Sequence, residues 1–326
     1  IYGTVMVPNN HPDVDIRLNQ LLLAVKYVYA TTFFANAKSY LANANVPGEE
    51  EKMGVVIQRL VGRRYGQRFY PHFAGVAQSY NYYPIGPQKP RDGVVQMVLG
   101  LGQMVVSGGS FVRFCPKHPG VLPQYATPRQ MVQSSQRSFY ALDMSQFFPV
   151  GGGQPGQNLI LCDLETAEAD GTLAPAASVY KPNDDIITES LNAQGPRVIT
   201  FNNILKHETI PLAPALQDLL ELTSAGMGTE VEMEFACDMG DWGRPAPRGR
   251  PRQEPTLFPL QVRPIVTLDA ISDLPEESLD PSTILVKSNK ALGHGRRTDL
   301  CDVVYVKHST FDPTHSPRIA EEVGRM

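Results

Sequence analysis

Two segments in which polar and apolar residues alternate constrain the fold more than any other feature of the chain. In the first, residues 230–237, apolar side chains alternate with Glu232 and Glu234. Successive side chains of a β-strand point to opposite faces of the sheet, so both carboxylates share one face. The segment is therefore predicted to be a strand with one polar and one apolar face.

The second segment, residues 257–265, has the same pattern. Apolar side chains alternate with Gln261 and Arg263, and Pro264 marks the end of the pairing because proline has no N–H to donate. If the two strands pair antiparallel, the two carboxylates lie beside a carboxamide and a guanidinium. The expected result is a small, charged patch on one face of a sheet.

Such a patch suits a metal-bound polyphosphate. Magnesium takes oxygen ligands and needs only one or two carboxylates besides the phosphates of its nucleotide, and Glu232 and Glu234 can supply them. Arg263 can hold phosphate oxygens bidentately, while Gln261 can orient an oxygen without adding charge. The alternative is a half-exposed hairpin with ordinary cross-strand ion pairs, each worth less than about 1 kcal/mol. The pattern alone favours this alternative.

A glycine-rich run, residues 100–109 (GLGQMVVSGG), follows the apolar segment 94–99. Glycines let the backbone approach a phosphate and expose N–H groups that bind anions. The run is neither a Walker loop nor a dinucleotide-binding fingerprint. The run alone favours the alternative, a simple glycine turn at the end of a buried strand.

Composition excludes several classes of protein. The chain has 326 residues, of which 42% are hydrophobic and 19% charged, as in soluble globular proteins. A formal net charge of −4 gives no electrostatic footprint for nucleic acid, and no segment is long and apolar enough to cross a membrane. The four cysteines are scattered without a CxxC pair, which favours neither disulfides nor zinc. A cytoplasmic protein is the expectation.

Helical and strand periods are mixed along the chain, so the fold class is predicted to be α+β. Helices are expected at about 18–29 and 211–223, and strands at 1–7, 53–60, 75–83 and 94–99. Between about 111 and 200 the signals weaken, and this part is expected to be an irregular insertion. A further helix is expected to begin at Ser316, followed by Pro317.

Four segments together resemble a known family. They are residues 75–84 (GVAQSYNYYP), 99–109 (LGLGQMVVSGG), 232–236 (EMEFA) and 260–265 (LQVRPI). Their order resembles the nucleotide-binding domain of phosphoenolpyruvate synthase and pyruvate phosphate dikinase, which has GV-x-F-T/S-x-x-P, GLGE-x-VV-x-G, D/E-hydrophobic-E and Q-x-RP motifs. The last motif is the sharpest. The resemblance implies an ATP-grasp-like fold, a mixed or antiparallel sheet covered by helices, over most of residues 1–268.

The resemblance also implies roles for individual residues. Glu234, with Glu232 beside it, would handle the metal, and Gln261 and Arg263 would engage the transferred phosphates as the catalytic pair. Ser79 would lie near the nucleotide.

The glycine run would supply Gly100, Gly102 and the adjacent backbone to the nucleotide. The family's glutamate in this loop is replaced here by Gln103. A carboxamide still accepts a hydrogen bond from a hydroxyl, but it is a much poorer metal ligand or base.

Parts of the family's machinery are not in the sequence. The family's essential lysine and Arg-Ser-Ser motif belong to an N-terminal lobe, expected to precede Ile1. Neither a T-x-H-A phosphohistidine motif nor a pyruvate-binding barrel is found, so these partners are expected only in a longer parent protein. The chain is therefore expected to be an N-terminally truncated ATP-grasp-like domain over 1–268, with 269–326 as the start of a following module.

The function implied is that of the ATP-binding part of a phosphotransferase of this family. It would pass a phosphoryl group from Mg-ATP to a phosphohistidine or another acceptor in the parent protein, while the isolated chain is expected to be inactive. The alternative is a non-catalytic nucleotide-sensing or scaffolding domain, which Gln103 favours. The sequence leaves open whether the parent is an active kinase, its final acceptor, its oligomeric state and the role of the basic loop 243–252.

Overall fold

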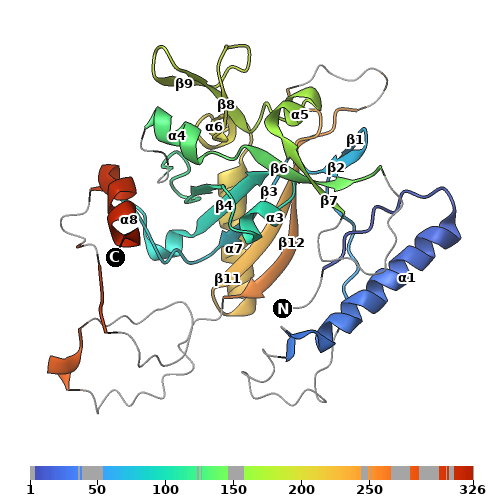
Figure 1. The fold of residues 1–326 in the computed structure, drawn as a ribbon, viewed down its shortest axis with the longest axis horizontal. Helices are drawn as coiled ribbons and strands as arrows, with labels where there is room; N and C mark the ends of the chain where they lie inside the picture. Colours follow the sequence, from blue (N-terminus) through green and yellow to red (C-terminus); the bar gives the residue numbers. More distant parts are fainter. Residues whose placement is uncertain are drawn as a thin grey trace.

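A computed structural model (Figure 1) shows an α+β fold, which confirms the predicted fold class. It describes residues 4–35, 37–38, 54–122, 125, 127–145, 158–243, 249, 251–265, 280–285, 301–305, 307 and 312–325. Within these residues the strands form three antiparallel sheets of five, four and three strands. None of the helices in this part of the chain is long and apolar enough to span a bilayer.

The five-stranded sheet is the centre of the molecule, and its order is β12-β11-β3-β4-β5. Its strands are β3 (Phe73–Gln78), β4 (Val94–Leu99), β5 (Val112–Phe114), β11 (Val231–Asp238) and β12 (Thr256–Pro264). The apolar side chains of β11 are fully buried, as its alternation predicts. The short β3 stops at Gln78, so the predicted strand 75–83 was too long at its end.

One face of this sheet is covered by α7 (Leu212–Met227), which runs behind the strands in Figure 1 and packs against β11, β3 and β12. Leu212, Leu216 and Leu220 recur every four residues, so they lie on one side of the helix, and all three are buried. Burial of each leucine contributes about 2 kcal/mol. The helix ends at Gly228, whose left-handed conformation (φ 68°) closes the last turn.

The second sheet has the order β1-β2-β6-β7, and the third has the order β10-β8-β9. Their strands are β1 (Arg63–Tyr65), β2 (Arg68–Tyr70), β6 (Ser138–Asp143), β7 (Leu159–Asp163), β8 (Ala177–Lys181), β9 (Ile186–Thr188) and β10 (Arg197–Ile199). The described residues between 111 and 200 thus contain regular strands that the sequence signals did not order. A common core joins the sheets and contains two pairs of contacting rings, Tyr70 with Phe139 and Phe73 with Phe201.

The remaining elements are short or peripheral. They are α1 (Val14–Ala30), η1 (Thr31–Phe33), η2 (Pro90–Asp92), α3 (Gln103–Val106), α4 (Pro128–Ser134), α5 (Leu164–Ala169), α6 (Asn202–Leu205), η5 (Pro281–Thr283), η7 (Pro313–His315) and α8 (Ser316–Gly324). The helices predicted near 18–29, near 211–223 and from Ser316 are confirmed.

Two predicted strands were wrong where the structure describes them. Residues 4–7 and 54–60 have no regular secondary structure, while residues 1–3 and 53 lie outside the described part. Residues 54–60 do lie near the edge of the central sheet, since Gln58 Nε2 donates to the Leu260 carbonyl at 2.9 Å. They form no ladder with β12, and nothing in the described structure explains their strand-like composition.

Candidate functional site

The two alternating strands are neighbours, and the predicted antiparallel pairing is confirmed. Glu232 lies opposite Arg263, and Glu234 lies opposite Gln261. The register shifts between Glu234 and Phe235, so that Phe235 faces Pro259. Such a bulge suits proline, which cannot donate a hydrogen bond to a neighbouring strand. The four predicted side chains are therefore brought together on one face of β11 and β12.

Glu232 has hydrogen-bond partners on both sides. Its Oε1 accepts from the guanidinium of Arg263, with Nε at 2.8 Å and Nη2 as a second donor. Its Oε2 accepts from Gln78 Nε2 at 2.7 Å. Gln78 lies opposite Glu232 on β3. The sequence prediction missed Gln78, although a lone carboxamide at the end of the otherwise apolar strand FAGVAQ was a visible signal.

Glu234 differs from Glu232. Its side chain is half-buried, and no residue in the described part of the chain donates a hydrogen bond to it or pairs with its charge. Its neighbour on β3 is Val76, which has no polar group to offer. The carboxylate of Glu234 is thus free of protein partners among the described residues.

Whether a magnesium ion fits this site depends on the carboxylate of Glu234. No group of three or more histidine, cysteine, aspartate or glutamate side chains in the described ranges can hold a metal by itself. Magnesium in nucleotide sites does not need such a group, because the phosphates and water supply most of its ligands. Glu234 therefore fits a nucleotide-bound magnesium ion. The metal roles expected for Glu232 and Glu234 stay predictions.

The glycine loop lies against the same face of the central sheet. Ala74, Val76 and Gln78 share one face of β3, which is the face of Glu232 and Glu234 on β11. A Cβ on Gly102 would lie 3.7 Å from the Ala74 side chain. Ala74 is two residues along the strand from Val76, or about 7 Å. Gly102 and the carboxylates therefore border one surface.

Gly100 has a structural explanation of its own. Its φ is +79°, and a Cβ there would come 2.7 Å from Phe139 Cδ2 and 2.8 Å from the Tyr140 carbonyl oxygen. The next residue, Leu101, donates its N–H to the same carbonyl at 3.0 Å. Gly100 is thus required by close packing of the loop on β6. Its expected contact with a nucleotide stays a prediction.

Gln103 and Ser79 are the two remaining predicted site residues. Gln103 is the half-buried first residue of α3. The Ser79 hydroxyl donates to Glu230 Oε2 at 2.7 Å and accepts from the Val231 N–H at 2.8 Å. Ser79 therefore fastens the end of β3 to the start of β11. Direct contact of either side chain with a nucleotide stays a prediction.

A second charged cluster, which the sequence analysis did not find, lies at the end of β11. Asp238 Oδ2 accepts from Arg63 Nε at 2.7 Å, and its Oδ1 accepts from the Gly240 N–H at 2.9 Å and lies 3.3 Å from His72 Nδ1. Burial alone would raise the pKa of Asp238, but its contacts with His72, Arg63 and the Gly240 N–H outweigh it and hold the pKa well below its usual range. The cluster anchors the start of the loop after β11.

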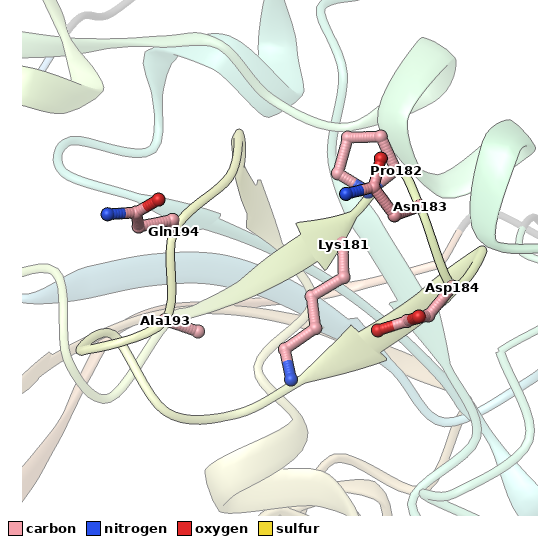
Figure 2. Close-up of a pocket in the computed structure, with 6 residues that line it drawn as sticks. All are labelled: Lys181, Pro182, Asn183, Asp184, Ala193 and Gln194. Atoms are coloured by element: carbon pink, nitrogen blue, oxygen red, sulfur yellow. The ribbon is translucent and has the colours of Figure 1, made fainter.

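The structure also has an open depression of about 390 Å³ on the third sheet (Figure 2). It is lined by residues at the end of β8 and before β10: Lys181, Pro182, Asn183, Asp184, Ala193 and Gln194. None of the predicted site residues lines it. The candidate site is instead the open face of the central sheet.

Comparison with known proteins assigns the chain to a family. No curated protein matches the chain. Residues 14–281 match the family described as pyruvate phosphate dikinase, AMP/ATP-binding domain. The matched span covers β11, β12, the glycine loop and the helix α7 behind them. Since it exceeds half of the chain, the protein belongs to the family of pyruvate phosphate dikinase AMP/ATP-binding domains and binds nucleotide, with ATP as the ligand of the domain.

Proposed function

We propose that the chain is the ATP-binding part of a phosphotransferase that passes a phosphoryl group from Mg-ATP to a phosphohistidine or another acceptor. The observation that carries the proposal is the pairing of Glu232 with Arg263 and of Glu234 with Gln261 on one open sheet face. A donor fork, a carboxamide and a carboxylate that no described residue pairs with lie side by side there. The phosphohistidine domain and a pyruvate-type substrate belong to the longer, cytoplasmic parent protein that we infer.

The residues take the following roles in this proposal. Arg263 and Gln261 engage the phosphates, and Glu234, with Glu232 beside it, holds the magnesium ion. Bound magnesium would neutralise charge on the phosphate oxygens. Ser79, Gly100, Gly102 and Gln103 border the nucleotide. The domain boundary near residue 268 is also a proposal, and the family match extends past it to 281.

The chemistry asked of these side chains is positioning and charge stabilisation. In phosphoryl transfer the charge of the moving group spreads over its oxygens, and the protein has little covalent work to do. A guanidinium presents a planar fork that matches two phosphate oxygens. Arg263 is suited to this, because its side chain is 60% exposed and points from an edge strand over the sheet face. A substrate phosphate can therefore reach it.

The test is Arg263→Ala in the parent protein, with transfer measured from γ-labelled ATP to the protein acceptor. We expect a loss of at least about 100-fold, as for other single donors to a transition-state charge. The fold should be unaffected, because Arg263 is exposed. Arg64→Ala is the matched control, since Arg64 is an exposed strand arginine remote from β12 in sequence and sheet.

Unchanged turnover in Arg263→Ala would contradict the proposal. ATP binding by the wild-type parent without any phosphorylated product would instead support a nucleotide-sensing or scaffolding domain. Gln103 is the residue that raises that alternative, and the family match does not favour it.

A further inference from the structure

A chain of hydrogen bonds crosses three strands beside the proposed phosphate site. Arg263 on β12 donates to Glu232 on β11, and Gln78 on β3 donates to the other oxygen of Glu232. The three residues lie directly opposite one another in the register of the sheet. Glu232 is only 15% exposed, whereas Arg263 is 60% exposed. Two half-buried side chains, Gln78 and Glu232, therefore hold the exposed guanidinium of Arg263.

Among the described residues, no such chain of hydrogen bonds runs through the neighbouring row of the sheet, which contains Glu234. Glu234 has Gln261 on one side and Val76 on the other. Val76 cannot donate a hydrogen bond. The difference between the two carboxylates thus comes from β3, where Val76 and Gln78 are successive residues on the same face. Three hydrogen bonds already occupy Glu232, two on Oε1 and one on Oε2, so it offers a metal fewer lone pairs than Glu234, which has no such partner among the described residues.

We propose that Gln78 and Glu232 are positioning residues that orient Arg263 toward the transferred phosphate, and that Glu234 alone meets the magnesium ion. This rests on the proposed function and divides its acidic pair into two roles. The Gln78 side chain donates its hydrogen bond to Oε2 of Glu232, the oxygen that Arg263 does not contact. This hydrogen bond limits the motion of the carboxylate and, through it, of the guanidinium.

The first test is Gln78→Met, which removes the hydrogen bond without changing charge or length. ATP and AMP affinities are measured by calorimetry on the full chain. We expect ATP binding to weaken by about threefold to tenfold, the usual effect of one hydrogen bond. AMP binding should stay unchanged, because AMP lacks the phosphate that Arg263 engages. A general structural defect would weaken both nucleotides.

Two further variants test whether Gln78→Met lowers ATP affinity through Arg263. In an Arg263→Met background, Gln78→Met should cause no additional loss of ATP affinity, since its action passes through Arg263. Gln96→Met is the matched control: Gln96 is a half-buried carboxamide opposite Val76 on the same sheet face, and it should not change either affinity. An equal loss in both Arg263 backgrounds would overturn the positioning role.

The second test compares Glu232→Gln with Glu234→Gln. For each variant, the ATP affinity is measured with saturating magnesium and with chelator, and the ratio gives the gain from magnesium. Glu234→Gln should reduce this gain by at least about tenfold, the range of a lost metal ligand or its support. Glu232→Gln should change it by less than about threefold, as expected of a charge that does not touch the metal. The reverse order would overturn the assignment.

The controls separate this inference from the proposed function. If the wild-type protein binds no ATP, or if Arg263→Met leaves ATP affinity unchanged, the proposed function fails. If the wild-type protein binds ATP and Arg263→Met weakens this binding, but Gln78→Met weakens ATP and AMP binding alike, only the positioning role fails.

Discussion

The glycine loop gives a sharp test of which of its glycines serve packing. Gly100 has φ +79°, and a methyl group there would meet the buried Phe139 ring at 2.7 Å and the Tyr140 carbonyl oxygen at 2.8 Å. The left-handed backbone costs an L-residue about 1–2 kcal/mol. Overpacking against a fixed ring and a strand carbonyl adds about 1–3 kcal/mol. Gly100→Ala should therefore destabilise the protein by roughly 3 kcal/mol.

Gly102→Ala is the matched control in the same loop. Gly102 has an ordinary right-handed backbone (φ −64°), and a Cβ would meet its nearest neighbour, the Ala74 methyl, at a normal 3.7 Å. We expect its free energy of unfolding to stay within about 0.5 kcal/mol of the wild type. Urea unfolding followed by Trp242 fluorescence measures both, because this tryptophan packs against the core.

Equal stability of Gly100→Ala and wild type would refute this reasoning, because it would show that β6 can move away from the loop. A Gly102→Ala variant as unstable as Gly100→Ala would refute it as well. The expected loss is a large fraction of a typical folding free energy of about 5–15 kcal/mol, so the two outcomes are well separated.

Two more predictions concern titratable groups. Because His72, Arg63 and Gly240 hold the pKa of Asp238 below its usual value, ionised Asp238 stabilises the fold above the unfolded pKa of about 4. This stability is lost as the pH falls through the folded pKa, so acid unfolding curves of Asp238→Asn should be flatter below pH about 4 than those of the wild type; parallel curves would contradict this. Burial, with the nearby charge of Asp238, raises the pKa of the Cys237 thiol to about 12. Iodoacetamide at pH about 8 should therefore modify exposed Cys301 and leave Cys237 unmodified in mass spectra, and rapid labelling of native Cys237 would contradict its burial.

Much of the candidate site could be predicted from local pattern. The alternation in 230–237 and 257–265 correctly placed Glu232, Glu234, Gln261 and Arg263 on one face of two paired strands. The reason is that strand geometry fixes the direction of each side chain without reference to the rest of the fold. The leucine spacing of α7 was equally readable, because a helix repeats over a few residues.

Other features could not be read in this way. Gln78 and Glu232 are 154 residues apart, and only the pairing of β3 with β11 makes them partners. The same pairing draws the Ser79 hydroxyl to Val231. The predicted strands at 1–7 and 53–60 failed in their described parts, 4–7 and 54–60, for a related reason: their composition fits a strand, but no described strand lies in register with them.

The sequence by itself determined which side chains share a face, and the family to which those motifs belong. The tertiary structure decided what each polar group on that face does with its hydrogen bonds. Glu232 and Glu234 are equivalent in the alternating pattern, yet the strand beside them offers a carboxamide to one and an isopropyl group to the other. The alternation of side chains is a local property of the backbone. The hydrogen-bond partner of each carboxylate depends instead on the register between strands that are distant in sequence, and this register gives a partner on β3 to Glu232 and none to Glu234.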